Sequence, residues 1–130
     1  MGKIKPTKDM ELGRHARKAV RAIQDRGHTV RTAEDEAGRV CLIGAVLKVT
    51  APMGTVRSNK LMHEFNERFG QWITQQYPAT QESTQLVREF AAGGFGDPPA
   101  TVWNDRILLH QEEACAWLGK FADAMDPRRL

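Results

Sequence analysis

The side chains that could do chemistry in this 130-residue chain are four histidines, two cysteines and scattered carboxylates, and they form no complete motif. His63 and Glu67 lie one helical turn apart, as in the metalloprotease helix His-Glu-x-x-His, but Glu67 stands where the second histidine is needed. Two ligands at that spacing hold a metal ion only if a third arrives from elsewhere. We therefore predict neither a metal site nor a cofactor.

Cys41 would be a nucleophile only if folding brought a histidine close to it. It lies in the longest apolar run, residues 38–47, and apolar surroundings raise the pKa of a thiol and make it unreactive. We interpret Cys41 as core packing, and Cys115, inside a helical pattern, in the same way. Two unpaired thiols and the lack of a long apolar segment favour a cytoplasmic protein.

The block Trp103-Asn104-Asp105 is the most interesting polar group, and it leaves two interpretations open. In the structural one, Asn104 or Asp105 caps the last helix while Trp103 packs across its start. In the functional one, the amide and carboxylate lie at the mouth of a pocket beside a helix N-terminus. That second arrangement would form a small-ligand or hydrolytic site.

Charge is distributed unevenly along the chain. Residues 1–31 carry nine Lys and Arg against three acids, whereas the rest carries ten against thirteen. Helical spacing gathers four basic residues of the first helix on one face, which is either a solvated surface or a surface that binds phosphates: Arg14, Arg17, Lys18 and Arg21. The second interpretation predicts non-specific nucleic-acid binding, with the basic lead as an additional arm.

Phe95 lies among glycines in Gly93-Gly94-Phe95-Gly96, which lacks the Lys-Ser/Thr of a phosphate-binding loop. An aromatic ring in such a loop is either an exposed anchor for a protein partner or a residue that folds back onto the core. The sequence does not choose between these alternatives.

The predicted elements are mainly helical. A first helix runs from about residue 9 to 26 with Thr7 or Asp9 as its cap, residues 29–32 resemble a short strand, and residues 40–49 fit a helix or a strand, of which we favour the helix. Gly44-Ala45 indicates close approach of a neighbouring helix. Ser58 is expected to cap a helix over 59–76, Thr80 a shorter helix that Gly93-Gly94 terminates, and a last helix follows Trp103-Asn104-Asp105.

These elements predict a mainly α fold, a single compact domain of four to five helices, with a small β-hairpin near residues 28–42 as an option. Residues 1–8 are predicted to be a flexible basic lead, 9–126 the helical domain and 127–130 a C-terminal tail.

Two blocks resemble a known family, and they are Gly38-Arg39-Val40-Cys41-Leu42-Ile43-Gly44-Ala45 and Trp103-Asn104-Asp105. The chain resembles small actinobacterial and actinophage domains. These domains carry a Gly-Arg-x-Cys-Leu-x-Gly-Ala block after their first helix and a Trp-Asn-Asp block just before their C-terminal helix. The function of that family is unknown. The resemblance implies a helical domain of actinobacterial or phage origin and no particular activity, and it does not extend over roughly residues 52–100.

With no complete catalytic set, we expect a small, non-enzymatic accessory protein, of phage type, that acts by binding a host protein. The candidate contact residues are Arg14, Arg17, Lys18, Arg21 and Phe95. Nucleic-acid binding and a site at Trp103-Asn104-Asp105 are the alternatives, and a homodimer is compatible with the aromatic helix faces.

Overall fold

The computed structural model describes residues 7–50 and 55–127, and these are mainly helical, with no β-strand among them. The mainly α class is therefore confirmed. The described chain forms six helices, more than the four to five expected: α1 (Lys8–Arg26), α2 (Leu42–Thr50), α3 (Thr55–Gln76), α4 (Gln81–Ala92), α5 (Ala100–Arg106) and α6 (Gln111–Met125). Residues 1–6 of the predicted lead and 128–130 of the predicted tail lie outside the described residues, while Lys8 belongs to α1.

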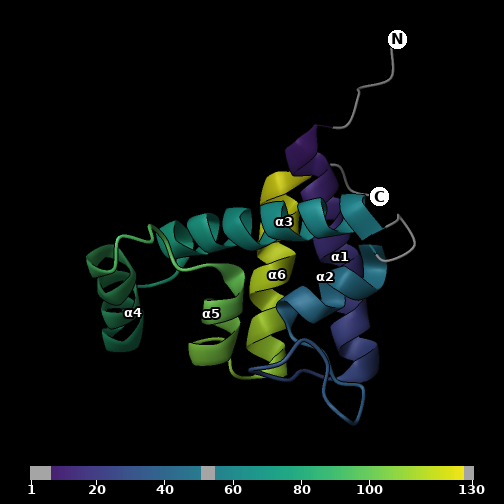
Figure 1. Cartoon of the computed structure of the whole chain (residues 1–130), viewed down its shortest axis with the longest axis horizontal. Helices are drawn as coiled ribbons and strands as arrows, with labels where there is room; N and C mark the ends of the chain where they lie inside the picture. The colour runs from purple at the N-terminus through teal and green to yellow at the C-terminus, as the bar shows by residue number, and fades with distance from the viewer. Residues whose placement is uncertain (1–6, 51–54, 128–130) are drawn as a thin grey trace.

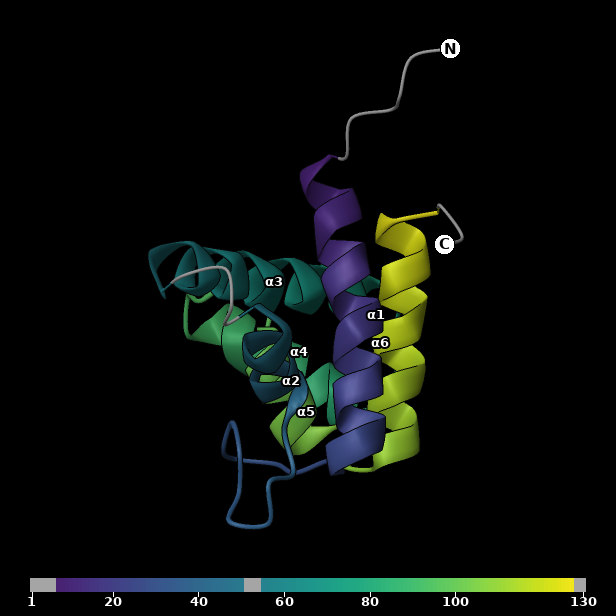
Figure 2. The same ribbon diagram turned by 90° about the vertical axis from the view of Figure 1, so that its right-hand side faces the viewer.

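Helices α1 and α6 lie side by side and antiparallel, and α3 runs across them (Figures 1 and 2). Gly13 permits this close packing, because a Cβ there would lie 2.7 Å from Cβ of Asp126 and 2.8 Å from the carbonyl oxygen of Ala122. Helix α4 lies at the far end of α3, away from the α1–α6 pair (Figure 1). Among the described residues, no helix is both long enough and apolar enough to cross a bilayer.

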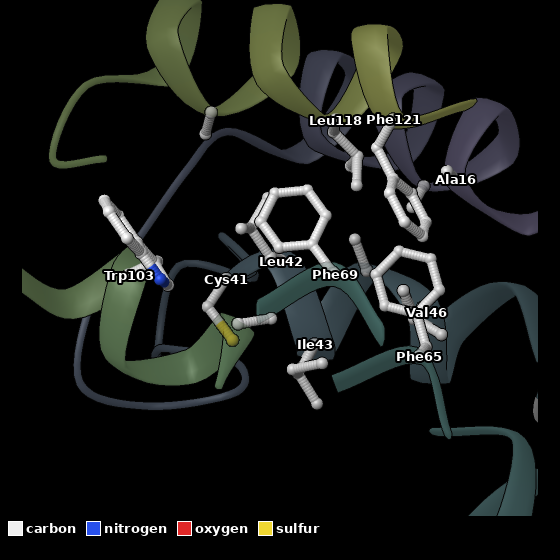
Figure 3. Close-up of a cluster of buried hydrophobic side chains, with 14 of the residues drawn as sticks. Ala16, Cys41, Leu42, Ile43, Val46, Phe65, Phe69, Trp103, Leu118 and Phe121 are labelled. Atoms are coloured by element: carbon white, nitrogen blue, oxygen red, sulfur yellow. The ribbon is translucent and has the colours of Figure 1, made fainter. Parts of the chain in front are cut away.

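One hydrophobic core unites the helices. Helix α3 supplies Phe65 and Phe69, both fully buried, and Phe121 of α6 packs against them with ring centroids 5.4 and 5.2 Å away (Figure 3). Such edge-to-face pairs add to the free energy gained from burying the apolar surface. The longest apolar run enters the same core through α2, so the helix favoured over residues 40–49 is confirmed from Leu42 onward.

The small β-hairpin that the sequence suggested near residues 28–42 is absent, and so is the short strand predicted over residues 29–32. Val40 makes two isolated bridges, to His28 and to Glu34, so no ladder extends on either side. Asp35 explains the interruption, because its carboxylate accepts the backbone N–H groups of Ala37 and Arg39 and thereby closes a tight turn.

Two predicted helix starts are confirmed and two are wrong. Thr7 and Thr80 cap α1 and α4 through their side chains. Ser58 is not a cap: it lies within α3 and its hydroxyl donates to the carbonyl oxygen of Thr50 at 2.7 Å. Neither Asn104 nor Asp105 caps the last helix, because both belong to α5, and α6 begins after His110 without a side-chain cap.

Candidate functional site

Asn104 of α5 is fully buried, and each of its polar atoms is used. Its Oδ1 accepts the N–H of His28 Nε2 at 2.7 Å and the backbone N–H of Leu42 at 3.3 Å. Its Nδ2 donates to the carbonyl oxygen of Thr29 at 3.2 Å and to Asp105 Oδ1 at 3.0 Å. An amide has two donor hydrogens and one acceptor oxygen, so Asn104 keeps no donor for a ligand.

Asp105 extends this network to the loop that precedes α2. Its Oδ1 accepts the backbone N–H of Arg31 at 2.7 Å, and Arg31 has a left-handed backbone with φ of 69°. Trp103 is also buried, and its indole N–H donates to Thr74 Oγ1 at 3.2 Å. We call the polar network the Asn104 corner, and it comprises His28, Thr29, Arg31, Leu42, Asn104 and Asp105. It connects α5 to the 27–41 loop and to the start of α2.

A hollow of about 180 Å³ lies beside this corner, and Cys41, Arg31, Thr101 and Asp105 are among its lining residues. Cys41 is only 5% exposed, and its Sγ accepts the backbone N–H of Gly44 at 3.2 Å. Burial raises the pKa of the Cys41 thiol, and the negative charge of Asp105 also raises it. The thiol is therefore protonated near neutral pH, which makes it a poor nucleophile.

The four basic residues of α1 do not act as one group. Arg17 is paired at its Nη1 with the buried carboxylate of Asp126 at 3.0 Å and at its Nη2 with Asp123 at 3.3 Å. Arg14, Lys18 and Arg21 are exposed, and none of them has a carboxylate partner among the described residues. Arg17 therefore connects α1 to α6, and the other three remain available.

His15 lies on the flank of the same helix and is 2% exposed, with no hydrogen-bond partner for Nδ1 among the described residues. Burial lowers the pKa of His15, and the positive charges of Arg14, Lys18 and Arg57 lower it further, against a smaller opposing effect of Glu11. The imidazole is therefore neutral near pH 7 and adds no charge to the basic face. Arg57, which the sequence did not single out, belongs to α3.

Phe95 is 78% exposed, so it does not fold back onto the core. Its position is nevertheless well defined: its backbone N–H donates to the carbonyl oxygen of Phe90 at 3.2 Å, and the two rings meet edge to face at 6.3 Å. Gly94 and Gly96 on either side have φ of 75° and 76°, which residues with a Cβ rarely adopt. The loop therefore holds Phe95 in a defined position and leaves its ring exposed to solvent.

The loop that carries Phe95 is anchored on α3. A Cβ at Gly70 would clash with the carbonyl oxygen of Pro98, and Asn66 Oδ1 accepts the backbone N–H of Thr101 at 3.1 Å. The loop and α3 enclose a hollow of about 460 Å³. We call this region the Phe95 surface, and its residues are Glu67, Gln71, Phe90, Phe95, Asp97 and Pro99.

Two carboxylates border the Phe95 surface, and no sequence pattern groups them with Phe95. Glu67 and Asp97 are both exposed, and neither has a cationic partner among the described residues. His63, one turn before Glu67, is exposed on α3. Within the described ranges, no three His, Cys, Asp or Glu side chains are arranged to share a metal ion.

Comparison of the chain with protein-family models, curated proteins and solved structures found no match. The resemblance to actinobacterial and actinophage domains therefore stays a prediction.

Proposed function

We propose that this protein is a non-enzymatic binding module that engages a protein partner through the Phe95 surface. The observation that carries the proposal is that Phe95 is 78% exposed, yet its backbone is held by a hydrogen bond and lies between two glycines with positive φ. A ring that is already ordered loses little conformational entropy when it is buried by a partner. Aromatic residues presented in this way are typical centres of binding energy.

The charges around Phe95 indicate the chemistry of the partner. Glu67 and Asp97 lie exposed beside the aromatic pair Phe90 and Phe95, without cations of their own in the described chain. The complementary ligand is a polypeptide segment with an apolar side chain flanked by Lys or Arg. The resemblance noted above makes an actinobacterial host the source in which we would seek it, with the protein acting as an accessory, phage-type factor.

Selection from a displayed peptide library on the immobilised protein tests this proposal. The wild type should enrich peptides that carry an apolar residue next to Lys or Arg, and Phe95→Ala should lose that enrichment. Leu109→Ala is the matched control, because Leu109 is another large exposed apolar residue, 49% exposed, outside the Phe95 surface. The same variants then serve in affinity capture from an actinobacterial lysate, where the selected peptide should displace the captured partner.

The proposal is wrong if the wild type enriches no peptide class, or if Phe95→Ala and the wild type enrich the same class equally. A further check is the double reversal Glu67→Lys with Asp97→Lys. It should reduce binding of the selected basic peptide, because both changes replace an attractive charge with a repulsive one.

A further inference from the structure

We propose that α1 and α3 together form a second binding surface, one that takes the phosphate backbone of a nucleic acid. It is independent of the Phe95 surface. The sequence alone pointed to the four basic residues of α1, whereas the structure excludes one of them and adds two cations from another helix. The surface comprises Arg14, Lys18 and Arg21 of α1 with Arg57 and Lys60 of α3.

The α1 part consists of three exposed cations with no carboxylate partner in the described chain. From Arg14 to Arg21 the helix axis rises by about 10 Å. Double-stranded DNA carries about six phosphates over that distance. Three cations at this spacing therefore have enough phosphates within reach.

The α3 part is brought beside α1 by tertiary structure. Lys8 Nζ of α1 and Glu64 Oε1 of α3 form an ion pair at 2.9 Å. A hollow of about 190 Å³ between the two helices is lined by Lys8 and Glu11 of α1 and by Arg57, Lys60, Leu61 and Glu64 of α3, and the Glu64 carboxylate is the one that Lys8 neutralises. Arg57 and Lys60 are exposed and unpaired among the described residues, so they continue the positive surface of α1.

The composition of the surface favours a nucleic acid over an anionic membrane. An interfacial helix binds lipid by burying an apolar face as well as by charge. The apolar face of α1 is already buried in the core, through Leu12, Ala16, Ala19 and Ile23. No aromatic ring is interleaved with the five cations, so we expect contacts to the backbone without base stacking and without sequence preference.

Fluorescence anisotropy with a labelled duplex of about 30 base pairs and mixed sequence, in DNA and RNA forms, tests the surface. Five phosphate contacts predict a slope of about −4.5 for log K against log salt with DNA. This slope corresponds to a loss of roughly 500-fold in affinity between about 50 mM and about 200 mM salt. RNA should bind through the same cations, and vesicles containing phosphatidylserine should not compete at equal phosphate concentration.

The decisive variant is Arg57→Gln with Lys60→Gln, which should make the slope shallower by about 1.8, since two contacts are lost. Neutralising three exposed cations elsewhere, Arg31→Gln with Arg88→Gln and Lys120→Gln, should leave the slope unchanged, and so should Phe95→Ala. The proposal is overturned if the wild type binds neither duplex at about 50 mM salt, if the α3 double variant keeps the full slope, or if vesicles displace the duplex. Melting temperatures of all variants confirm that each is folded.

Discussion

At the Asn104 corner, a buried amide and a carboxylate satisfy one another and the backbone around them, whereas at the Phe95 surface an aromatic ring and two carboxylates face solvent. The corner connects segments about 75 residues apart, since Asn104 bonds both His28 and Thr29. The Phe95 loop packs on α3, and no other described segment covers it. The two regions differ in whether their side chains are already paired within the protein, and not in the chemical types of those side chains. Paired groups support the fold, whereas unpaired groups can contact a partner.

The same contrast divides the basic face of α1. Arg17 is committed to Asp126 and Asp123, and Lys18 beside it is not. The two residues are adjacent in sequence and have the same charge. The position of α6 alone determines that Arg17 stabilises the fold, whereas Lys18 stays available to a ligand.

Asn104→Ala should produce the largest effect and is the strongest test of the corner's role. It removes four hydrogen bonds and leaves the backbone N–H of Leu42 buried without its acceptor. We expect the free energy of unfolding to fall by about 3 kcal/mol, measured by urea denaturation. Affinity for a peptide selected on the Phe95 surface should not change in conditions where the variant is folded.

Asn59→Ala is the matched control, because Asn59 is exposed on α3. It should change the free energy of unfolding by less than about 0.5 kcal/mol. Equal small losses in the two variants would contradict the structural role of the corner. Lost peptide binding by a fully stable Asn104→Ala would reverse the comparison and make the corner the contact site.

Gly44→Ala tests how closely the 27–41 loop approaches α2. A Cβ at Gly44 would clash with the carbonyl oxygen of Ala33, whose backbone position is also held by the N–H of Cys41 at 3.1 Å. The sequence predicted that a helix comes close at Gly44, and the neighbour is this loop instead. We expect overpacking to lower the free energy of unfolding by about 2 kcal/mol, measured by urea denaturation.

Gly119→Ala should change the free energy of unfolding in the opposite direction, measured in the same way. Gly119 lies inside α6, and a Cβ there would meet nothing within 4 Å. Alanine is the better helix former, so this variant should be more stable by roughly 0.5–1 kcal/mol. If both substitutions stabilised the protein, the close contact between Gly44 and Ala33 would be refuted.

Patterns that depend on neighbours in sequence predicted the fold well. The helical pattern located α1 and most of α3, and the Thr80 cap marked the start of α4. The short α5 was missed because seven residues after two prolines carry too little periodicity to distinguish a helix from a cap. Reading Asn104 as a cap followed from that error.

The site could be predicted only in part, because its assignments depend on distant residues. Nothing near Arg17 in sequence distinguishes it from Lys18, since its partner Asp126 comes 109 residues later. The acids beside Phe95 come from two separate segments, so grouping Glu67 with Asp97 required the loop to be located on α3. Phe95 itself was found by its glycine-rich setting, and the structure added its exposure.

Asp105→Ala should have a smaller effect than Asn104→Ala or Gly44→Ala. Its carboxylate accepts the backbone N–H of Arg31 and the amide N–H of Asn104 through one oxygen. We expect the free energy of unfolding to fall by about 1 kcal/mol, measured by thermal and urea denaturation, with partner binding retained. Asp105→Asn retains an acceptor oxygen and should lose less, so an equal loss in both variants would show that the carboxylate charge matters more than these hydrogen bonds.

Phe95→Ala should have the smallest effect on stability and thereby completes the comparison. Phe95 is 78% exposed, and its ring meets the Phe90 ring edge to face and lies beside Gly93 of its own loop. We expect the free energy of unfolding to change by less than about 0.5 kcal/mol, measured by urea denaturation, while peptide binding is lost. A loss as large as that of Asn104→Ala would mean that Phe95 supports the fold, and the distinction between the two regions would fail.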